Sequence, residues 1–251
     1  MPHRSDLESP HLVPLLLLLI LATTAGLVVA AAVARLGPRV PPARALGAVA
    51  IAGGTLFGVL TLLVSSSDHP SAVDRSTARW AHEHSSAFSR NALDAITRLG
   101  SIETIAVFCV VLALYMVRRR RALWAVPFLG AVVAGEEVLS LSFKALVSRP
   151  RPTLSSAASS LGPAFPSGHS TNAAAFYAAA ALVLSQALGP RARAGLFGAA
   201  AFIAVAVAGS RVLLDLHWLT DVIGGLALGW TWFAVCALVF GAWRRGGREV
   251  S

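Results

Sequence analysis

Two long apolar runs near the end of the chain are joined by Ser210-Arg211-Val212-Leu213-Leu214-Asp215-Leu216-His217-Trp218-Leu219-Thr220-Asp221. His217 and Asp221 are four residues apart, which on a helix places them on one face, about 6 Å apart along the axis. A carboxylate there could hold one imidazole nitrogen while the other faced a substrate. Arg211 offers a planar set of donors suited to a phosphate or carboxylate. A buried ion pair at a helix end is the alternative interpretation of this stretch alone.

The composition indicates a membrane protein. Of 251 residues, 56% are hydrophobic and only 13% are charged, whereas about a quarter of the residues of a soluble domain are charged. Apolar runs of about 20 residues, the length of a transmembrane helix, recur along the whole chain. The sequence therefore predicts an all-α, polytopic membrane helical bundle. We interpret the net charge of +9 as a topology signal and not as a nucleic-acid-binding surface.

The apolar runs predict seven spans, at 12–34, 45–64, 102–117, 122–146, 170–188, 195–208 with its extension, and 222–243. We expect residues 1–44 to form an additional helix and a basic cytoplasmic loop, and 45–243 to form a six-span core. The run 12–34 favours a retained helix, with a signal peptide as the alternative. The polar stretch 65–101 carries apolar residues at helical spacing, which predicts an amphipathic segment in the membrane interface.

The arginine distribution predicts the orientation. The connections at 35–45, 118–121 and 190–194 and the tail at 244–251 contain twelve of the twenty arginines. By the positive-inside rule these segments are cytoplasmic, the carboxyl terminus included. The segment 65–101, the loop 147–168 and the Arg211–Asp221 junction would then all face outward.

Other candidate sites are weaker. Cys109 and Cys236 each lie inside an apolar run, without a CxxC pattern or a loop partner, so we interpret them as small buried residues and not as a disulfide or a zinc site. His82-Glu83-His84 has no further ligand at a metal-site spacing, and a solvated helix face explains it better.

Three segments converge on the predicted outer face: Lys144 to Pro152, Pro166 to His169, and Ser210 to Asp221. Together they supply cations, two histidines, a carboxylate and a helix amino terminus, whose unpaired amides favour an anion. The chain has no cysteine nucleophile in these segments, no Walker loop and no carboxylate cluster for magnesium. This set fits phosphoryl transfer with a histidine nucleophile and cations on the equatorial oxygens.

The spacing of these segments resembles a known signature. Lys144 is followed after six residues by Arg151-Pro152; Pro166-Ser167-Gly168-His169 comes next; Ser210-Arg211 is then followed by His217 and Asp221. This pattern resembles the three-part signature of the type-2 phosphatidic acid phosphatase superfamily. These are integral-membrane lipid phosphate phosphatases, related to glucose-6-phosphatase and the vanadium haloperoxidases. All three parts occur in order and with intact internal spacing, and the six-span family core maps onto roughly 45–243.

The resemblance implies a role for each matching residue. His217 would attack phosphorus and form a phosphohistidine, and Asp221 would orient it. His169 would protonate the leaving alkoxide and then activate water. Five residues would hold the phosphoryl oxygens: Lys144, Arg151, Ser167, Gly168 and Arg211. The resemblance implies no metal and no other cofactor.

Three further residues are candidates. Arg149 is either an additional phosphate contact or a loop cation. Glu136 and Glu137 lie inside the fourth span, where carboxylates are costly and suggest function. Glu137 is seven residues before Lys144 and shares a helix face with it, and we expect at least one of the two glutamates to face the bundle interior, protonated or paired with an arginine.

These observations predict an enzyme of the bacterial plasma membrane that hydrolyses a lipid phosphate or diphosphate at the outer face. Undecaprenyl diphosphate and phosphatidate-type glycerolipids both fit, and the outward site together with the Ala- and Arg-rich, Lys-poor composition slightly favours the first. The expected partners are the lipid substrate and the bilayer, without nucleic acid. A transporter would explain the intramembrane glutamates but not two histidines and three cations on one face. No inverted repeat is apparent.

Overall fold

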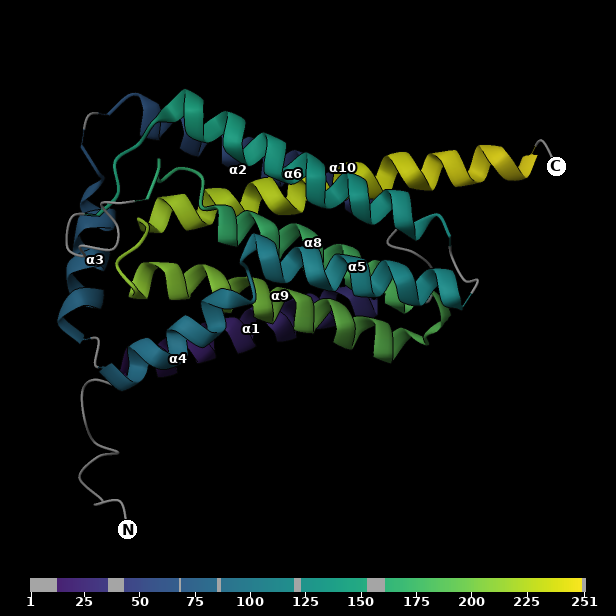
Figure 1. The fold of residues 1–251 in the computed structure, drawn as a ribbon, viewed down its shortest axis with the longest axis horizontal. Coiled ribbons are helices and arrows are strands. Elements are labelled where there is room, and N and C mark those ends of the chain that lie inside the picture. Colours follow the sequence, from purple (N-terminus) through teal and green to yellow (C-terminus); the bar gives the residue numbers. More distant parts are fainter. Residues whose placement is uncertain are drawn as a thin grey trace, which may run out of the picture.

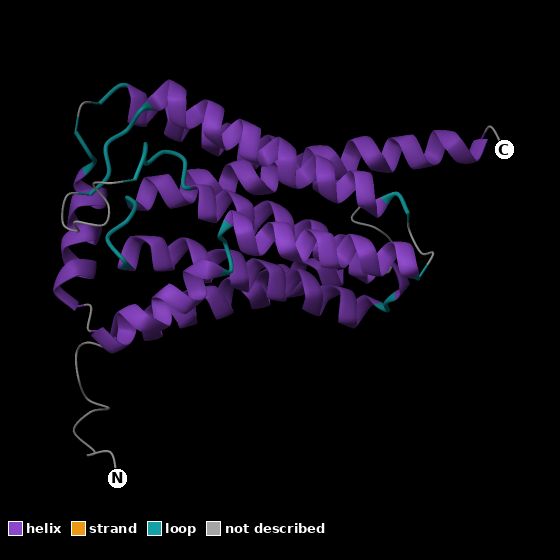
Figure 2. Ribbon diagram, in the orientation of Figure 1, coloured by secondary structure: helices purple, strands orange, loops and turns teal. Residues whose placement is uncertain are grey.

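The computed structural model describes residues 13–35, 43–67, 69–84, 87–119, 123–152 and 161–249. Their regular structure is entirely helical (Figure 2), which confirms the predicted fold class. The helices are α1 (Val13–Arg35), α2 (Ala43–Ser65), α3 (Ala72–His84), α4 (Ala87–Arg98), α5 (Ile102–Arg118), α6 (Ala125–Val147), α8 (Gly168–Leu184), α9 (Pro190–Leu213) and α10 (Leu219–Glu249). A short 3₁₀ turn, Ser185–Ala187, follows α8.

The long helices run side by side along one axis of the bundle (Figure 1). Within the described ranges, α2, α6, α9 and α10 are long and apolar enough to cross a membrane, and the bent pair α4–α5 is a fifth candidate if it forms one span. All seven predicted spans correspond to helices, but α5 and α8 have only 17 residues each. That is the lower limit for crossing a bilayer.

The predicted amphipathic stretch 65–101 contains two helices and not one. α3 lies across one end of the bundle, and α4 runs obliquely beside it (Figure 1). α3 buries Ala78 and Ala81, and α4 buries Leu93 against the last turn of α9. This apolar face agrees with the helical spacing seen in the sequence. The position of this pair in the membrane interface stays a prediction.

The centre of the bundle is α8, which contacts α5, α6, α9 and α10. Most of its residues are buried and many are alanine, so neighbouring backbones come close. Gly225 and Gly229 of α10 face it: a Cβ at these positions would lie 2.6 Å from the Ser167 carbonyl oxygen and 2.5 Å from that of Thr171. This small-residue contact brings the first turns of α8 and α10 together.

A side chain at position 225 should therefore destabilise the protein and push the first turns of α8 and α10 apart. We expect Gly225→Ala to lower the free energy of unfolding by about 1–3 kcal/mol, since the obstructing atom belongs to the backbone. Thermal unfolding in detergent measures this. Gly130→Ala on α6 is the matched control, because a Cβ there has nothing within 4 Å. Equal unfolding temperatures for the two variants would contradict the close contact.

The three motif segments meet at the end of the bundle that carries α3. α6 and α9 end there, and α8 and α10 begin there (Figure 1). α1 packs along α9, where a Cβ on Gly26 would lie 2.8 Å from the Gly198 carbonyl oxygen. Residues 1–12 and 36–42 lie outside the described residues, so the expected basic loop after α1 is not described. Of the basic segments expected to be cytoplasmic, 190–194 lies at the end opposite the motifs.

Candidate active site

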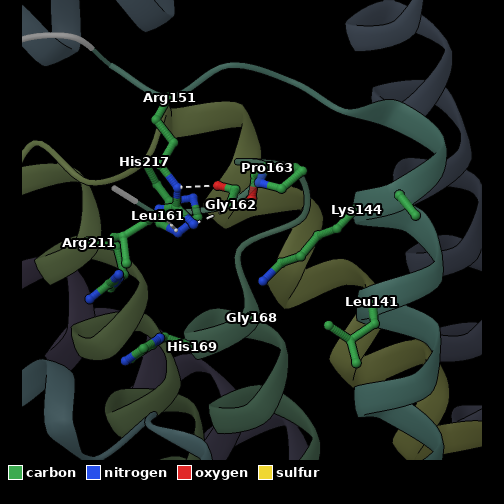
Figure 3. Close-up of a pocket in the computed structure, with 11 residues that line it drawn as sticks. Leu141, Lys144, Arg151, Leu161, Gly162, Pro163, Gly168, His169, Arg211 and His217 are labelled. Carbon is green, nitrogen blue, oxygen red and sulfur yellow. Dashed lines mark hydrogen bonds between the residues drawn. The ribbon is translucent and has the colours of Figure 1, made fainter. Parts of the chain in front are cut away.

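The motif segments enclose a cavity of about 500 Å³. Its lining is Leu141, Lys144, Ala145, Arg151, Leu161, Gly162, Pro163, Gly168, His169, Arg211 and His217. Figure 3 shows Lys144 extending from α6 toward the imidazole of His217 and the guanidinium of Arg151. Six predicted site residues thus come together from five segments: α6, the loop after it, α8, α9 and the loop before α10. The apolar residues Leu141, Ala145 and Leu161 border the same cavity.

Gly168 allows the first turn of α8 to lie close to Lys144. A Cβ at position 168 would be 3.2 Å from Lys144 Nζ and 3.8 Å from Ser140 Oγ, so a larger residue would displace the ammonium. The amides of this first turn have no intrahelical acceptor and point toward the cavity end of the helix. The glycine therefore leaves room for an anion between the ammonium and the helix amino terminus.

His217 does not lie on a helix, contrary to the expected helical face. It precedes α10, and Trp218 occupies the position just before the first helical residue. Asp221, in the first turn, accepts the Trp218 amide N–H through Oδ2 at 2.9 Å. This contact satisfies one unpaired amide of the helix amino terminus. The same oxygen lies 3.4 Å from His217 Nδ1, which is at the long limit for a hydrogen bond, so this contact is chiefly electrostatic.

The contacts of His217 define its tautomer. Nε2 lies 2.9 Å from Arg151 Nη1. A guanidinium can only donate, so Nε2 accepts and carries no proton. The proton of the neutral ring is then on Nδ1, which faces Asp221. The lone pair of Nε2 accepts the hydrogen bond from Arg151, and an unprotonated Nε2 is the form that a histidine nucleophile requires.

Arg151 is held by backbone carbonyl groups as well. Its Nε donates to Gly162 at 2.7 Å, and its Nη1 donates to Leu216 at 2.7 Å. These acceptors are neutral, and within the described ranges no carboxylate forms a direct ion pair with Arg151. Its positive charge remains available to an anion in the cavity.

Arg211 approaches from the last turn of α9 and is 6% exposed. Its Nη1 donates to Thr97 Oγ1 of α4 at 3.1 Å, and its Nε has no hydrogen-bond partner among the described residues. α4 therefore positions one of the cavity cations. The sequence motifs did not indicate Thr97, because the motifs and α4 are far apart in the chain.

Other predicted residues lie outside the cavity lining. Ser167 is fully buried, and its hydroxyl accepts from Ser170 at 3.0 Å. Arg149 lies behind Asp221: it donates to this carboxylate and, at 2.8 Å, to Asp74 of α3. Asp74 itself was not predicted as a site residue.

The two glutamates of α6 differ in burial. Glu136 is 1% exposed, and neither of its carboxyl oxygens has a hydrogen-bond partner among the described residues. It shares a face with Ser140 and Lys144, four and eight residues on. The prediction that at least one glutamate faces the interior is thus confirmed by Glu136. Glu137 is partly exposed and does not line the cavity.

The buried imidazole of His217 should affect stability as the pH falls. Burial is the largest effect on His217 and lowers its pKa to about 4, against about 6.5 for a free histidine. Between these values the unfolded chain binds a proton that the folded protein does not, so acidification favours unfolding. We expect the unfolding temperature to fall from pH 7 to pH 4.5, and to fall less in His217→Gln. Equal slopes in the two proteins would contradict a neutral His217.

Comparison with known proteins indicates the family of this chain. The PAP2 superfamily model matches residues 125–245. The chain is 32% identical to phosphatidylglycerophosphatase B of Bacillus subtilis over 139 residues, which are 55% of this chain and 68% of that protein. It is 42% identical over 77 residues to a lipid A 1-phosphatase of Rhizobium johnstonii, a match that spans 30% of this chain and 28% of that protein.

A solved structure is similar as well. It is the crystal structure of a transmembrane PAP2-type phosphatidylglycerolphosphate phosphatase from Bacillus subtilis. The TM-score is 0.66 at 28% identity, over 73% of this chain and 93% of that one. Fold, site and relatives together define a multi-pass membrane lipid phosphate phosphatase. The chain belongs to the PAP2 superfamily, which confirms the resemblance seen in its three motifs.

Proposed function

We propose that this enzyme hydrolyses a lipid phosphate without a metal ion, at the outer face of the membrane, through a phosphohistidine on His217. The observation that carries the proposal is the 2.9 Å contact between Arg151 Nη1 and His217 Nε2, which requires Nε2 to accept, in a cavity that Lys144 and Arg211 also line. A neutral nucleophile and three cations in one cavity match an attack on a phosphate monoester.

In the first step the phosphoryl oxygens would accept hydrogen bonds from Lys144, Arg151 and Arg211. Arg151 would turn its donors from Nε2 to the phosphate and leave the lone pair free. Nε2 then forms a bond to phosphorus while the bond from phosphorus to the lipid oxygen breaks. His169 also lines the cavity; it would take up a proton when the bound phosphate dianion offsets the neighbouring cations, and it then transfers this proton to the leaving oxygen.

In the second step the roles of His169 reverse. Its neutral ring takes a proton from water, the water oxygen bonds to phosphorus, and the bond from phosphorus to Nε2 breaks. Inorganic phosphate leaves, and His169 is again protonated. The Nδ1 proton of His217 stays on the ring throughout, facing Asp221, which offsets the positive charge that develops on the imidazole.

The relatives favour a glycerolipid phosphate as the substrate. The Bacillus subtilis protein and the solved structure are both described as phosphatases of phosphatidylglycerophosphate. We therefore propose this lipid first, ahead of the undecaprenyl diphosphate that the expected outward site and the composition slightly favoured. Leu141 and Leu161 are 54% and 44% exposed at the cavity border, where they would contact the first carbons of a lipid tail.

The test is phosphate release by the detergent-purified protein in EDTA. Phosphatidylglycerophosphate, phosphatidate and undecaprenyl diphosphate would be compared at equal surface concentration. We expect release that survives EDTA, with phosphatidylglycerophosphate hydrolysed fastest. Release that stops in EDTA and returns with a divalent ion would contradict the proposal. Right-side-out vesicles given a short-chain, membrane-impermeant substrate test the sidedness: hydrolysis only after permeabilisation would place the site on the inner face.

A further inference from the structure

Asp221 has two carboxylate oxygens with different partners. Oδ2 accepts the Trp218 amide and lies 3.4 Å from His217 Nδ1. Oδ1 accepts a hydrogen bond from Arg149. Rotation of the carboxylate away from His217 would therefore break its contacts with Arg149 and Trp218 together. Arg149 therefore fixes Oδ1 of Asp221, whose Oδ2 faces His217.

Arg149 is itself held on several sides. It is 8% exposed, and Nη1 also donates to Thr220 Oγ1 at 2.7 Å. Nη2 donates to Asp74 Oδ2 at 2.8 Å, and the guanidinium carbon lies 5.8 Å from the centroid of the Trp218 ring. A buried guanidinium needs partners of opposite charge, and here two carboxylates supply them.

Asp74 links this group to α3. It is 1% exposed, and its Oδ1 accepts the Thr220 amide at 2.9 Å. That amide is in the first turn of α10 and has no intrahelical acceptor, so a carboxylate is stabilised there by the helix amino terminus. Burial opposes ionisation of Asp74, but the hydrogen bonds from Thr220 and Arg149 outweigh it and hold the pKa below its ordinary value.

We propose that Asp74 and Arg149 are positioning residues for His217, which act through Asp221. The chain of contacts runs from Asp74 to Arg149, from Arg149 to Asp221, and from Asp221 to His217. Neither Asp74 nor Arg149 lines the cavity, so their effect is on the orientation and tautomer of the imidazole and not on phosphate binding. The inference rests on the proposed nucleophilic role of His217, and it makes α3 a functional part of the site.

The kinetic test uses Asp74→Asn and Arg149→Gln. We expect kcat to fall about 10- to 100-fold in each, since small misplacement of a reacting group has effects of this size, while KM changes less than about threefold. Asp74→Glu, which keeps the charge, should recover part of kcat. The double variant Asp74→Asn/Arg149→Gln should be no slower than the slower single variant, because both changes release the same carboxylate.

The matched control is Asp215→Asn. Asp215 is also 1% exposed and also ties the motif loop to α3 and α4, through His82 at 3.0 Å and Arg90 at 2.9 Å. It has no contact with Asp221, and asparagine tolerates its positive φ of 60°. We expect Asp215→Asn to lower the unfolding temperature but to retain kcat per folded molecule. Equal losses of kcat in Asp74→Asn and Asp215→Asn would show that α3 is only a structural tether, and would overturn the proposal.

A second measurement does not depend on turnover. The ¹⁵N shifts of the His217 ring, assigned by comparison with His217→Gln, report which nitrogen carries the proton. With inorganic phosphate bound, when Arg151 would turn from Nε2 to the ligand, we expect Nδ1–H in the wild type and in Asp215→Asn, and a mixture of tautomers in Arg149→Gln. An unchanged tautomer in Arg149→Gln would overturn the positioning role. If the wild type released no phosphate but the tautomer still shifted, the proposed function would fail while the coupling of Arg149 to His217 would stand.

Discussion

Replacing His217 with alanine is expected to lower kcat for phosphate release by about 10⁴-fold or more, since loss of a covalent nucleophile removes the pathway and not one contact. The lone pair of Nε2, which accepts a hydrogen bond from Arg151, would form the bond to phosphorus. Residual hydrolysis would come from the cations that still bind the phosphate. KM should change little, because Lys144, Arg151 and Arg211 remain.

The control for this variant is His84→Ala. His84 stacks on Trp80 with ring centroids 5.1 Å apart and does not line the cavity, so its loss should leave kcat within about twofold of the wild type, as surface changes away from a site usually do. Both variants should bind inorganic vanadate or phosphate if they are folded. A His217→Ala protein that still turns over at more than a few per cent of the wild-type rate would exclude His217 as the nucleophile.

Replacing His169 with alanine is expected to have the second largest effect. A lipid alkoxide is a poor leaving group and needs a proton, so kcat should fall about 10²- to 10⁴-fold, the usual range for loss of a general acid. An aryl phosphate such as p-nitrophenyl phosphate leaves without a proton. Its first step should therefore survive in His169→Ala, while attack by water on the phosphohistidine stays slow.

The difference between the lipid and the aryl leaving group tests whether His169 is the general acid. We expect His169→Ala to release a burst of about one nitrophenolate per protein and then to turn over slowly, as an accumulating covalent intermediate requires. His217→Ala run beside it should show no burst. If His169→Ala lost the same factor on the lipid and on the aryl ester, without a burst, His169 would not be the general acid. A role in binding would then explain the loss.

The helical fold was predictable because apolar run length is a strong signal in a membrane chain; the orientation that the arginine placement indicates stays a prediction. The seven runs correspond to helices, and the three motifs do meet at one end of the bundle. The local geometry was less predictable. The four-residue spacing of His217 and Asp221 suggested a helix face, but the helix begins only at Leu219, and the Trp218 amide uses the carboxylate as a cap.

The contribution of α3 and α4 could not be read from the motifs, since Asp74 and Thr97 lie well before them in the chain. One signal was present in the sequence. Asp74, Ala78 and Ala81 recur at helical spacing, and all three are buried on one face of α3. A carboxylate on the apolar face of an amphipathic helix needs a cationic or amide partner, and Arg149 and Thr220 are those partners.

The most direct test of the account is to trap the intermediate on the protein. Wild-type enzyme would be mixed with phosphatidylglycerophosphate labelled in its terminal phosphate, in EDTA, and quenched in alkali within one turnover, since a phosphohistidine survives alkali but not acid. Mass spectrometry of the peptides would locate the label. We predict a phosphoryl group on His217 alone, absent from His217→Ala. Label on another residue, or none while phosphate is being released, would contradict a phosphohistidine mechanism.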